Sequence, residues 1–347
     1  MTLLSVEKPS PEVASMRAMS EQGRALMGGT RAMRDAGQAY LPRFESESDA
    51  SYAARLKGSW LFNGYKKTVR DMAGRVFDKP VEIVEGPPRL NEWAENIDLA
   101  GRDLSTFALS VFEDALSGCG ISWVMVDAPP REGQVTQAQA QSQNLRPYLV
   151  HLSVEDVLGW RVENVGGVPT VTMLRIKEAA READPKDEFA DQEVEQIRVL
   201  DIPEGRVRTR LFRKSSETGW QQWGDDQFSD MDRITVVPFY AQRAGFWQGE
   251  PVLDDLADVN IAHWQSQSDQ RNILHFARVP ILFATGRSED EGPMTISAGM
   301  ARTASDPQAR LQWVEHGGQA IGAGRQDLKD LEFQMEAHGL QLLAARP

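Results

Sequence analysis

The stretch "NIAHWQSQSDQRNILHFARVPILFATG", residues 260–286, begins like a helix and ends like a strand. A helix with one buried face shows a large apolar residue about every three or four positions. Between Trp264 and Ile273 there is none, because Gln265 to Asn272 are all polar. The sequence therefore predicts that this part of the helix is exposed or packs against something polar.

The neighbouring segments predict two long helices around a small β unit. The first helix is expected to start near Gly249-Glu250-Pro251, with proline in its first turn, and to run to about Arg278. "VPILFATG" (279–286) and "RLQWVEH" (310–316) are predicted strands. The last helix is expected from about Gln319 to Ala344.

Upstream of this part, the pattern predicts helices first. Residues 12–36, with "MGGT" in the middle, should form two short helices with a glycine break. The apolar spacing from Tyr52 to Val76 predicts one helix, ending at residues 78–80.

A further predicted helix carries an apolar stripe made of Leu104, Phe107, Val111 and Phe112. Gly118 lies where a left-handed cap belongs, and "GISWVMVD" (120–127) then reads as an apolar strand. Stripe and strand are too apolar to stay exposed on a soluble chain. We expect the stripe to share one core with Trp123 and Val126.

The middle of the chain is predicted to be β-rich, with two polar insertions at residues 129–146 and 178–193 that should be a mobile loop and a solvated segment. Residues 203–205, Pro-Glu-Gly, predict a hairpin turn. The predicted strands are "RPYLVHL" (146–152), "GWRVENV" (159–165), "TVTMLRI" (170–176), "EQIRVLDI" (195–202), "RVRTRLFR" (206–213) and "ITVVPFY" (234–240).

Composition indicates a globular protein, with 347 residues of which 41% are apolar. No apolar run is long enough for a membrane helix, and the N-terminus lacks signal-peptide features, so we expect the chain to remain in the cytoplasm of its cell. The single cysteine, Cys119, excludes an intrachain disulfide and is expected to be a buried core residue. The net charge of −13 argues against tight DNA binding, although not against DNA passing nearby.

Patterns typical of enzymes are weak in this chain. No glycine-rich phosphate loop with lysine is present, and the five histidines lack zinc-ligand spacing. Asp254 and Asp258 lie on one helix face and could hold Mg²⁺, but acids are also favoured at a helix start by the helix dipole. Ser153 has no GxSxG context. The sequence predicts no enzyme, cofactor or resident metal, with a Mg²⁺-dependent hydrolase as the less favoured alternative.

Four segments in order carry a family resemblance: residues 40–81, 151–167, 237–286 and 317–344. From "YLPRFESESDASYAARLKGSW" through "HLSVEDVLGWRVENVGG" and "GEPVLDDLADVNIAHW" to "GGQAIGAGRQDLKDLEFQM", the chain resembles tailed-bacteriophage portal proteins. The likeness is greatest to a portal-like prophage family first catalogued as a domain of unknown function. Members normally continue into a tunnel loop and a crown, and this chain stops where the tunnel loop should begin.

The resemblance implies an α+β, portal-like fold: a wing at 1–248, a first stem helix at 249–278, a clip at 279–316 and a second stem helix at 317–347. It also implies a ring, usually of about twelve copies, at one capsid vertex of the virion, assembled in the bacterial host cytoplasm. The implied partners are further copies of the chain, the large terminase, tail or adaptor proteins, and the major capsid protein or scaffold. Double-stranded DNA would pass through without tight binding, helped by the acidic charge, and no membrane is involved.

Two sets of residues follow from this resemblance. Gln265, Ser268 and Asp269 on the first stem helix, with Gln326 and Asp330 on the second, are expected at a subunit interface or channel wall. We expect the polar stretch to lie outside any intrachain core, so that leucine at position 268 or 269 would hardly change monomer folding. The residues Arg287, Glu289, Asp290 and Glu291 should face the terminase, although charge runs beside glycine and proline usually indicate only a solvated hairpin loop. Another capsid or head–tail adaptor oligomer is the alternative function.

Overall fold

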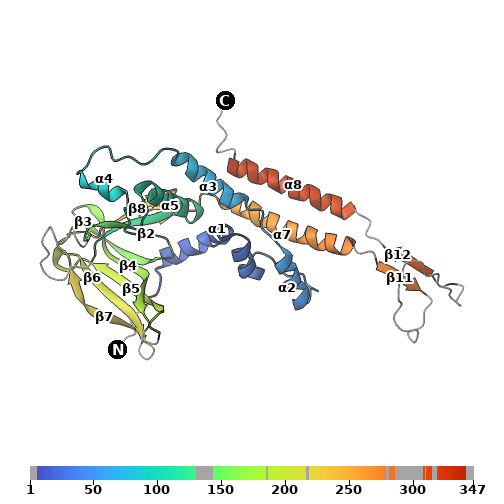
Figure 1. Ribbon diagram of the computed structural model, residues 1–347, viewed down its shortest axis with the longest axis horizontal. Helices are drawn as coiled ribbons and strands as arrows, with labels where there is room; N and C mark the ends of the chain where they lie inside the picture. Colours follow the sequence, from blue (N-terminus) through green and yellow to red (C-terminus); the bar gives the residue numbers. More distant parts are fainter. Residues whose placement is uncertain are drawn as a thin grey trace. The chain divides into compact units, whose positions relative to one another are not determined.

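A computed structural model describes residues 6–129, 144–184, 187–215, 219–278, 281–285, 308, 310–314 and 319–340. The fold is α+β, with helices and several antiparallel sheets (Figure 1). The chain divides into two compact units, described separately below. Unit 1 is Met1–Gly28, Tyr65–Ala257 and Ala345–Pro347, and unit 2 is Gly29–Gly64 and Asp258–Ala344.

The predicted glycine break in the first helix is present, whereas the next predicted helix is divided in two. Helix α1, Pro11–Ala36, contains a kink at Gly29 (φ 73°, ψ −159°), which confirms the glycine break. The single helix predicted from Tyr52 to Val76 is wrong, because α2 (Asp49–Gly58) and α3 (Gly64–Val76) are separate.

Side chains from other elements form hydrogen bonds with the backbone of the segment between α2 and α3. The Ser59 carbonyl accepts a hydrogen bond from Arg34 Nε at 3.0 Å, and Leu61 N–H donates to Thr30 Oγ1 at 3.1 Å. Asn260 Nδ2 donates to the Phe62 carbonyl at 2.8 Å. These contacts satisfy backbone groups that a continuous helix would have paired internally.

Unit 1 contains a three-stranded antiparallel sheet in the order β2-β1-β8, covered by α5. Asp103 caps α5 by accepting a hydrogen bond from Thr106 N–H at 2.7 Å. The elements are α4 (Arg89–Ala94), α5 (Leu104–Ser117), β1 (Ile121–Asp127), β2 (Tyr148–Leu152), β8 (Val236–Tyr240), β9 (Arg243–Gly245) and β10 (Gln248–Gly249).

Strand β1 separates two apolar clusters, so the single core predicted for α5 and β1 is wrong. Phe107 and Val111 of α5 pack with Val124, whereas Trp123 belongs to a larger core with Trp160 and Trp247. Val126 is 41% exposed. Successive side chains of a strand point to opposite faces, which places positions 123 and 124 in different clusters.

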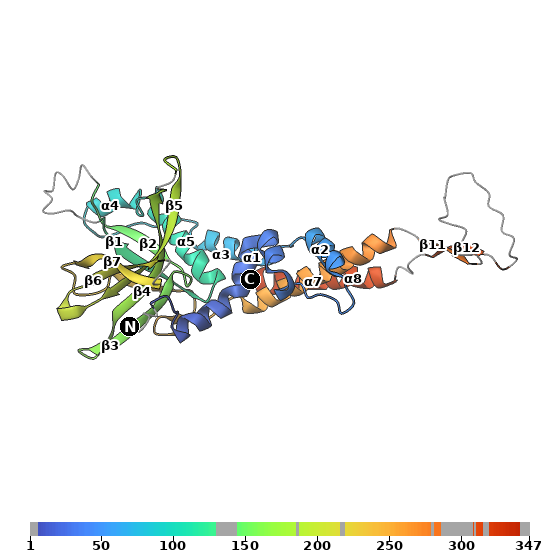
Figure 2. The same cartoon turned by 90° about the horizontal axis from the view of Figure 1, so that it is seen from below.

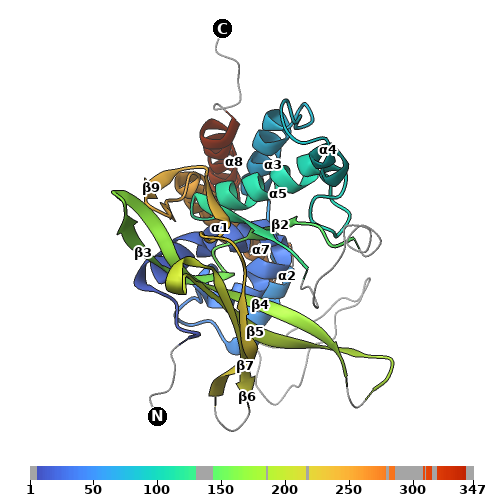
Figure 3. The same ribbon diagram turned by 90° about the vertical axis from the view of Figure 1, so that its left-hand side faces the viewer.

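The second sheet of unit 1 has five antiparallel strands in the order β3-β4-β5-β6-β7. Figure 3 shows β4, β5, β6 and β7 side by side. The strands are β3 (Val157–Val165), β4 (Val168–Ala183), β5 (Asp191–Asp201), β6 (Arg208–Ser215) and β7 (Gly219–Phe228).

The turn between β5 and β6 agrees with prediction, whereas the polar parts of the strands differ from it. Residues 203–205 connect β5 to β6, which confirms the predicted turn. The insertion at 178–193 does not interrupt the sheet, because β4 and β5 extend through it as far as the pair Ala183 and Asp191. Strand β7 was not predicted, since its side chains are mostly polar and exposed. Most of the insertion at 129–146 lies outside the described residues.

The connection from α5 to β1 is tight, and its left-handed residue is not the predicted one. Gly118 has φ −102°, whereas Gly120 has φ +79°. A Cβ on Gly120 would lie 2.1 Å from the Glu250 carbonyl oxygen. Cys119 between them is fully buried, which confirms that prediction, and burial raises the pKa of its thiol to about 11.

Unit 2 contains the predicted order of helix, two strands and helix. Helices α7 (Asp254–Ala277) and α8 (Gln319–Leu340) run side by side in Figures 1 and 2, and β11 (Ile281–Thr285) pairs antiparallel with β12 (Arg310–Val314). Helix α7 begins at Asp254 and not near residues 249–251 as predicted, and Gly249 belongs to strand β10. Among the described helices, none combines the length and apolar content that a bilayer crossing requires.

Candidate functional site

The polar stretch of α7 finds polar partners within unit 2. Gln265 Nε2 donates to the Tyr40 carbonyl at 3.0 Å, and the hydroxyls of Ser268 and Ser59 are 2.9 Å apart. Gln270 Nε2 donates to the Ile321 carbonyl of α8 at 2.9 Å. Packing against polar groups is therefore the correct one of the two predicted explanations for this helix.

The expectation that the stretch lies outside any intrachain core is wrong for two of its members. Ser268 is 2% exposed and Gln270 is 6% exposed. A leucine at position 268 would replace a buried hydroxyl and leave the Ser59 hydroxyl without this partner, so we expect it to destabilise the monomer instead. Gln265 and Asp269 are partly exposed. Their place at a subunit interface stays a prediction.

A buried ion pair fixes α2 to the loop before it and reaches α7. Arg55 donates to both carboxylate oxygens of Glu47, at 2.9 and 2.8 Å, and these two side chains are 3% and 4% exposed. Arg55 also donates to the Pro42 carbonyl at 2.8 Å and lies 3.5 Å from Asp269 Oδ1. Bidentate arginine–carboxylate pairs of this kind are among the stronger charge-assisted hydrogen bonds.

The pKa values in this cluster shift according to their surroundings. Hydrogen bonding from Arg55 holds the pKa of Glu47 below its ordinary value, and the same contact raises the pKa of Arg55. Burial raises the pKa of Asp269, against the opposing effect of the Arg55 charge. The cluster therefore favours an ionised Glu47 at neutral pH.

Helix α8 runs antiparallel to α7 and is held on its other side by two hydrogen bonds, beside which lies one longer polar contact. Ser266 Oγ donates to Asp327 Oδ2, Gln270 contacts Ile321, and His263 Nε2 lies 3.5 Å from Glu332 Oε1. His263 is 1% exposed, and burial lowers its pKa. Within the described residues, both ring nitrogens of His263, Trp264 Nε1, Gln267 Oε1 and Gln270 Oε1 are buried without a hydrogen-bond partner.

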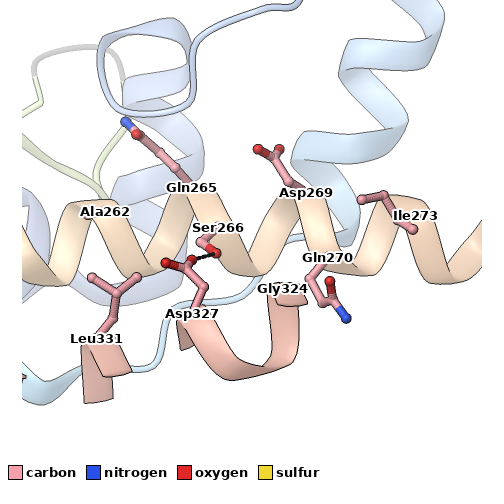
Figure 4. A pocket seen from close by; sticks show the side chains of 9 residues that line it. All are labelled: Ala262, Gln265, Ser266, Asp269, Gln270, Ile273, Gly324, Asp327 and Leu331. Carbon is pink, nitrogen blue, oxygen red and sulfur yellow. Dashed lines mark hydrogen bonds between the residues drawn. The ribbon is translucent and has the colours of Figure 1, made fainter. Parts of the chain in front are cut away.

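A groove of about 430 Å³ lies along these two helices (Figure 4). Its walls combine carboxylates, amides and a few apolar side chains. The lining residues are Ala262, Gln265, Ser266, Asp269, Gln270, Ile273, Gly324, Asp327 and Leu331. The arrangement can bind a partner that offers positive charge together with apolar surface.

Gly324 allows the close approach of α8 at this groove. A Cβ at this position would lie 2.2 Å from Gln270 Oε1, whereas a Cβ at Gly322 would meet open space. Gly322→Ala is expected to stabilise the protein by about 0.5–1 kcal/mol through helix propensity.

Gly324→Ala is expected to be destabilising by about 1–3 kcal/mol instead, because the Gln270 amide must move away from Ile321. Thermal melting of both variants checks the pair, and equal stabilisation by the two alanines would contradict the close contact.

The other residues singled out in the sequence are distributed differently. Asp254 and Asp258 are exposed in the first turns of α7, and the described residues hold no group of three or more His, Cys, Asp or Glu arranged to bind a metal. Ser153 Oγ donates to Asp156 Oδ2 at 2.7 Å, which makes a local turn contact. Gln326 Nε2 donates to Asp330 Oδ1 at 2.8 Å on the exposed side of α8.

The predicted terminase-facing residues Arg287, Glu289, Asp290 and Glu291 lie outside the described part of the chain. Sequence reasoning missed Arg55, Glu47 and Ser59. Ser59 and its partner Ser268 are 209 positions apart, so no local spacing could have connected them.

One family model matches this chain, over residues 252–347, and it is described as a domain of unknown function, DUF4055. The matched part covers α7, β11, β12 and α8. No curated protein matches the chain significantly.

Proposed function

We propose that this chain is the subunit of a portal-type ring that surrounds a channel for double-stranded DNA at a capsid vertex. The observation that carries the proposal is the helix, β pair and helix of unit 2. Helices α7 and α8 have 24 and 22 residues, and β11 and β12 pair antiparallel between them in the chain. This order is the one that the resemblance to portal proteins implies for stem, clip and stem.

Two further observations support the proposal. The DUF4055 match covers this same helix–β–helix segment, so the segment recurs in other proteins as a unit. In addition, α7 and α8 are joined by polar contacts, and the outward side of α8 is exposed over much of its length. Helices arranged around a water-filled channel would have solvent or a neighbouring copy on that side.

The charge of the chain agrees with a channel through which DNA moves. A net charge of −13 repels the phosphate backbone, so the duplex would slide without being trapped. Under this proposal, further copies, the terminase, tail or adaptor proteins and the capsid protein or scaffold are the partners, and the virion is the location. The segment with Arg287, Glu289, Asp290 and Glu291 remains the proposed terminase-facing surface.

Particle averaging by negative-stain electron microscopy tests the proposal directly. We expect rings with a central hole, and light scattering should give a mass of many subunits. A monodisperse monomer of 38.7 kDa at all protein concentrations would contradict a ring. Another head–tail adaptor oligomer is the alternative, and it would form a ring without needing the α7–β11–β12–α8 arrangement.

A further inference from the structure

The arginine and the lysine of α8, Arg325 and Lys329, lie on the side of the helix away from Asp327. Residues two positions apart on a helix are separated by about 200° around its axis, and residues four apart lie on one side. Arg325, Lys329 and Phe333 therefore form one stripe, which we call the basic stripe. Asp327 and Leu331 lie on the other side, where they line the groove described above.

The basic stripe has the features of an unoccupied contact surface. Arg325 and Lys329 are exposed, and within the described part of the chain neither makes an ion pair or hydrogen bond. Phe333 is 68% exposed, so its ring offers apolar surface one turn beyond Lys329. Glu332 and Glu336 follow Arg325 and Lys329 by seven residues, so the same side of α8 ends in two carboxylates, of which Glu332 contacts His263.

The groove on the other side is complementary to this stripe. Asp327 is exposed, and the Asp269 side chain is 45% exposed although it also contacts Arg55. Ala262, Ile273 and Leu331 add apolar surface on either side of the carboxylates (Figure 4). The groove thus offers negative charge beside apolar groups, which suits two cations and an aromatic ring.

We propose that the basic stripe of one copy docks in the groove of the next copy. The occupant is a second copy of this chain because the matching charges lie on the same helix pair, in unit 2. Stripe and groove are different surfaces, so the contact is heterologous and can repeat in one direction until the ring closes. This inference rests on the proposed ring and identifies the surfaces through which its subunits meet.

Reversing one charge on the stripe tests the docking. Lys329→Glu is expected to raise the protein concentration at which half of the subunits are assembled by about tenfold or more, since two like charges would then face each other. Lys57→Glu changes the net charge equally on exposed α2 and should assemble like the wild type. Light scattering across a dilution series measures both, and circular dichroism melts verify that the variants are folded.

A charge exchange makes the test specific for this pairing. Asp327→Lys should also impair assembly, and the double variant Asp327→Lys/Lys329→Glu should restore it, because both charges across the contact are then exchanged. Phe333→Ala should weaken assembly, whereas Phe189→Ala, at a residue that is 90% exposed, should not. Wild-type assembly should weaken as salt is added.

The outcomes separate this inference from the ring proposal. If the wild type forms rings and Lys329→Glu and Phe333→Ala form them at the same concentration, the docking surfaces are wrong and the ring stands. Folded single variants that fail to assemble, with a folded double variant that also fails, would overturn the pairing of Lys329 with Asp327. A wild type that never assembles would overturn both proposals.

Discussion

Arg55→Met is expected to lower the free energy of unfolding by about 3–5 kcal/mol, because it leaves one carboxylate buried without its partner. That carboxylate belongs to Glu47, whose side chain is 4% exposed and accepts two hydrogen bonds from Arg55. Methionine fills similar space but donates no hydrogen bond. Urea unfolding followed by far-ultraviolet circular dichroism measures the loss.

Two control variants isolate the effect of the buried pair. Arg31→Met removes the same group from a side chain that is 94% exposed and lies 3.9 Å from Asp35, so the change should stay within about 0.5 kcal/mol. The double variant Arg55→Met/Glu47→Leu should recover most of the lost stability, since both charges are gone. Equal effects of the Arg55 and Arg31 changes would show that the buried pair does not stabilise the fold.

The pH dependence of the free energy of unfolding gives a second test of the buried ion pair. The lowered pKa of Glu47 contributes stability that is present above its ordinary pKa of about 4.3 and is lost as the pH falls through the folded value. Asp269 has a raised pKa and acts in the opposite sense, because its contribution is lost as the pH rises through that value. Arg55→Met should therefore reduce the fall in stability below about pH 4.3.

Phe107→Ala is expected to cost about 3–5 kcal/mol through the cavity that it leaves beneath α5. Phe107 is 2% exposed and packs with Ile97, Val111 and Val124. The guanidinium of Arg102 also lies over its ring, with Cζ 5.2 Å from the centroid. Calorimetric melting measures the change.

Phe189→Ala is the matched control, because it removes the same atoms from a ring that is 90% exposed in unit 1. Its effect should stay within about 0.5 kcal/mol. A loss below about 1 kcal/mol at position 107 would remove α5 from the core.

Apolar spacing predicted α5 and a continuous apolar stretch predicted β1, because burial leaves a trace in the sequence. The same signal failed between α2 and α3. Its spacing continues through the break, while the groups that hold the break open, Arg34, Thr30 and Asn260, come from other elements. A tertiary contact can thus end a helix that the local pattern would continue.

The candidate site was predictable only in its general nature. Eight polar residues in a long helix indicated polar surroundings, but the partners of Ser268 and Gln270 lie far away in the sequence. Gly120 illustrates the same limit for backbone conformation. Gly118 occupied the expected cap position, whereas the close approach of the Glu250 carbonyl makes glycine necessary two residues later.

The burial of Cys119 has a practical consequence for following how unit 1 opens. The chain has one thiol, it is fully buried, and burial raises its pKa to about 11, so alkylating reagents at neutral pH meet almost no thiolate in the folded state. Modification must wait until the α5–β1 connection separates from its surroundings. The labelling rate of Cys119, measured by mass spectrometry, therefore reports local or global opening around β1.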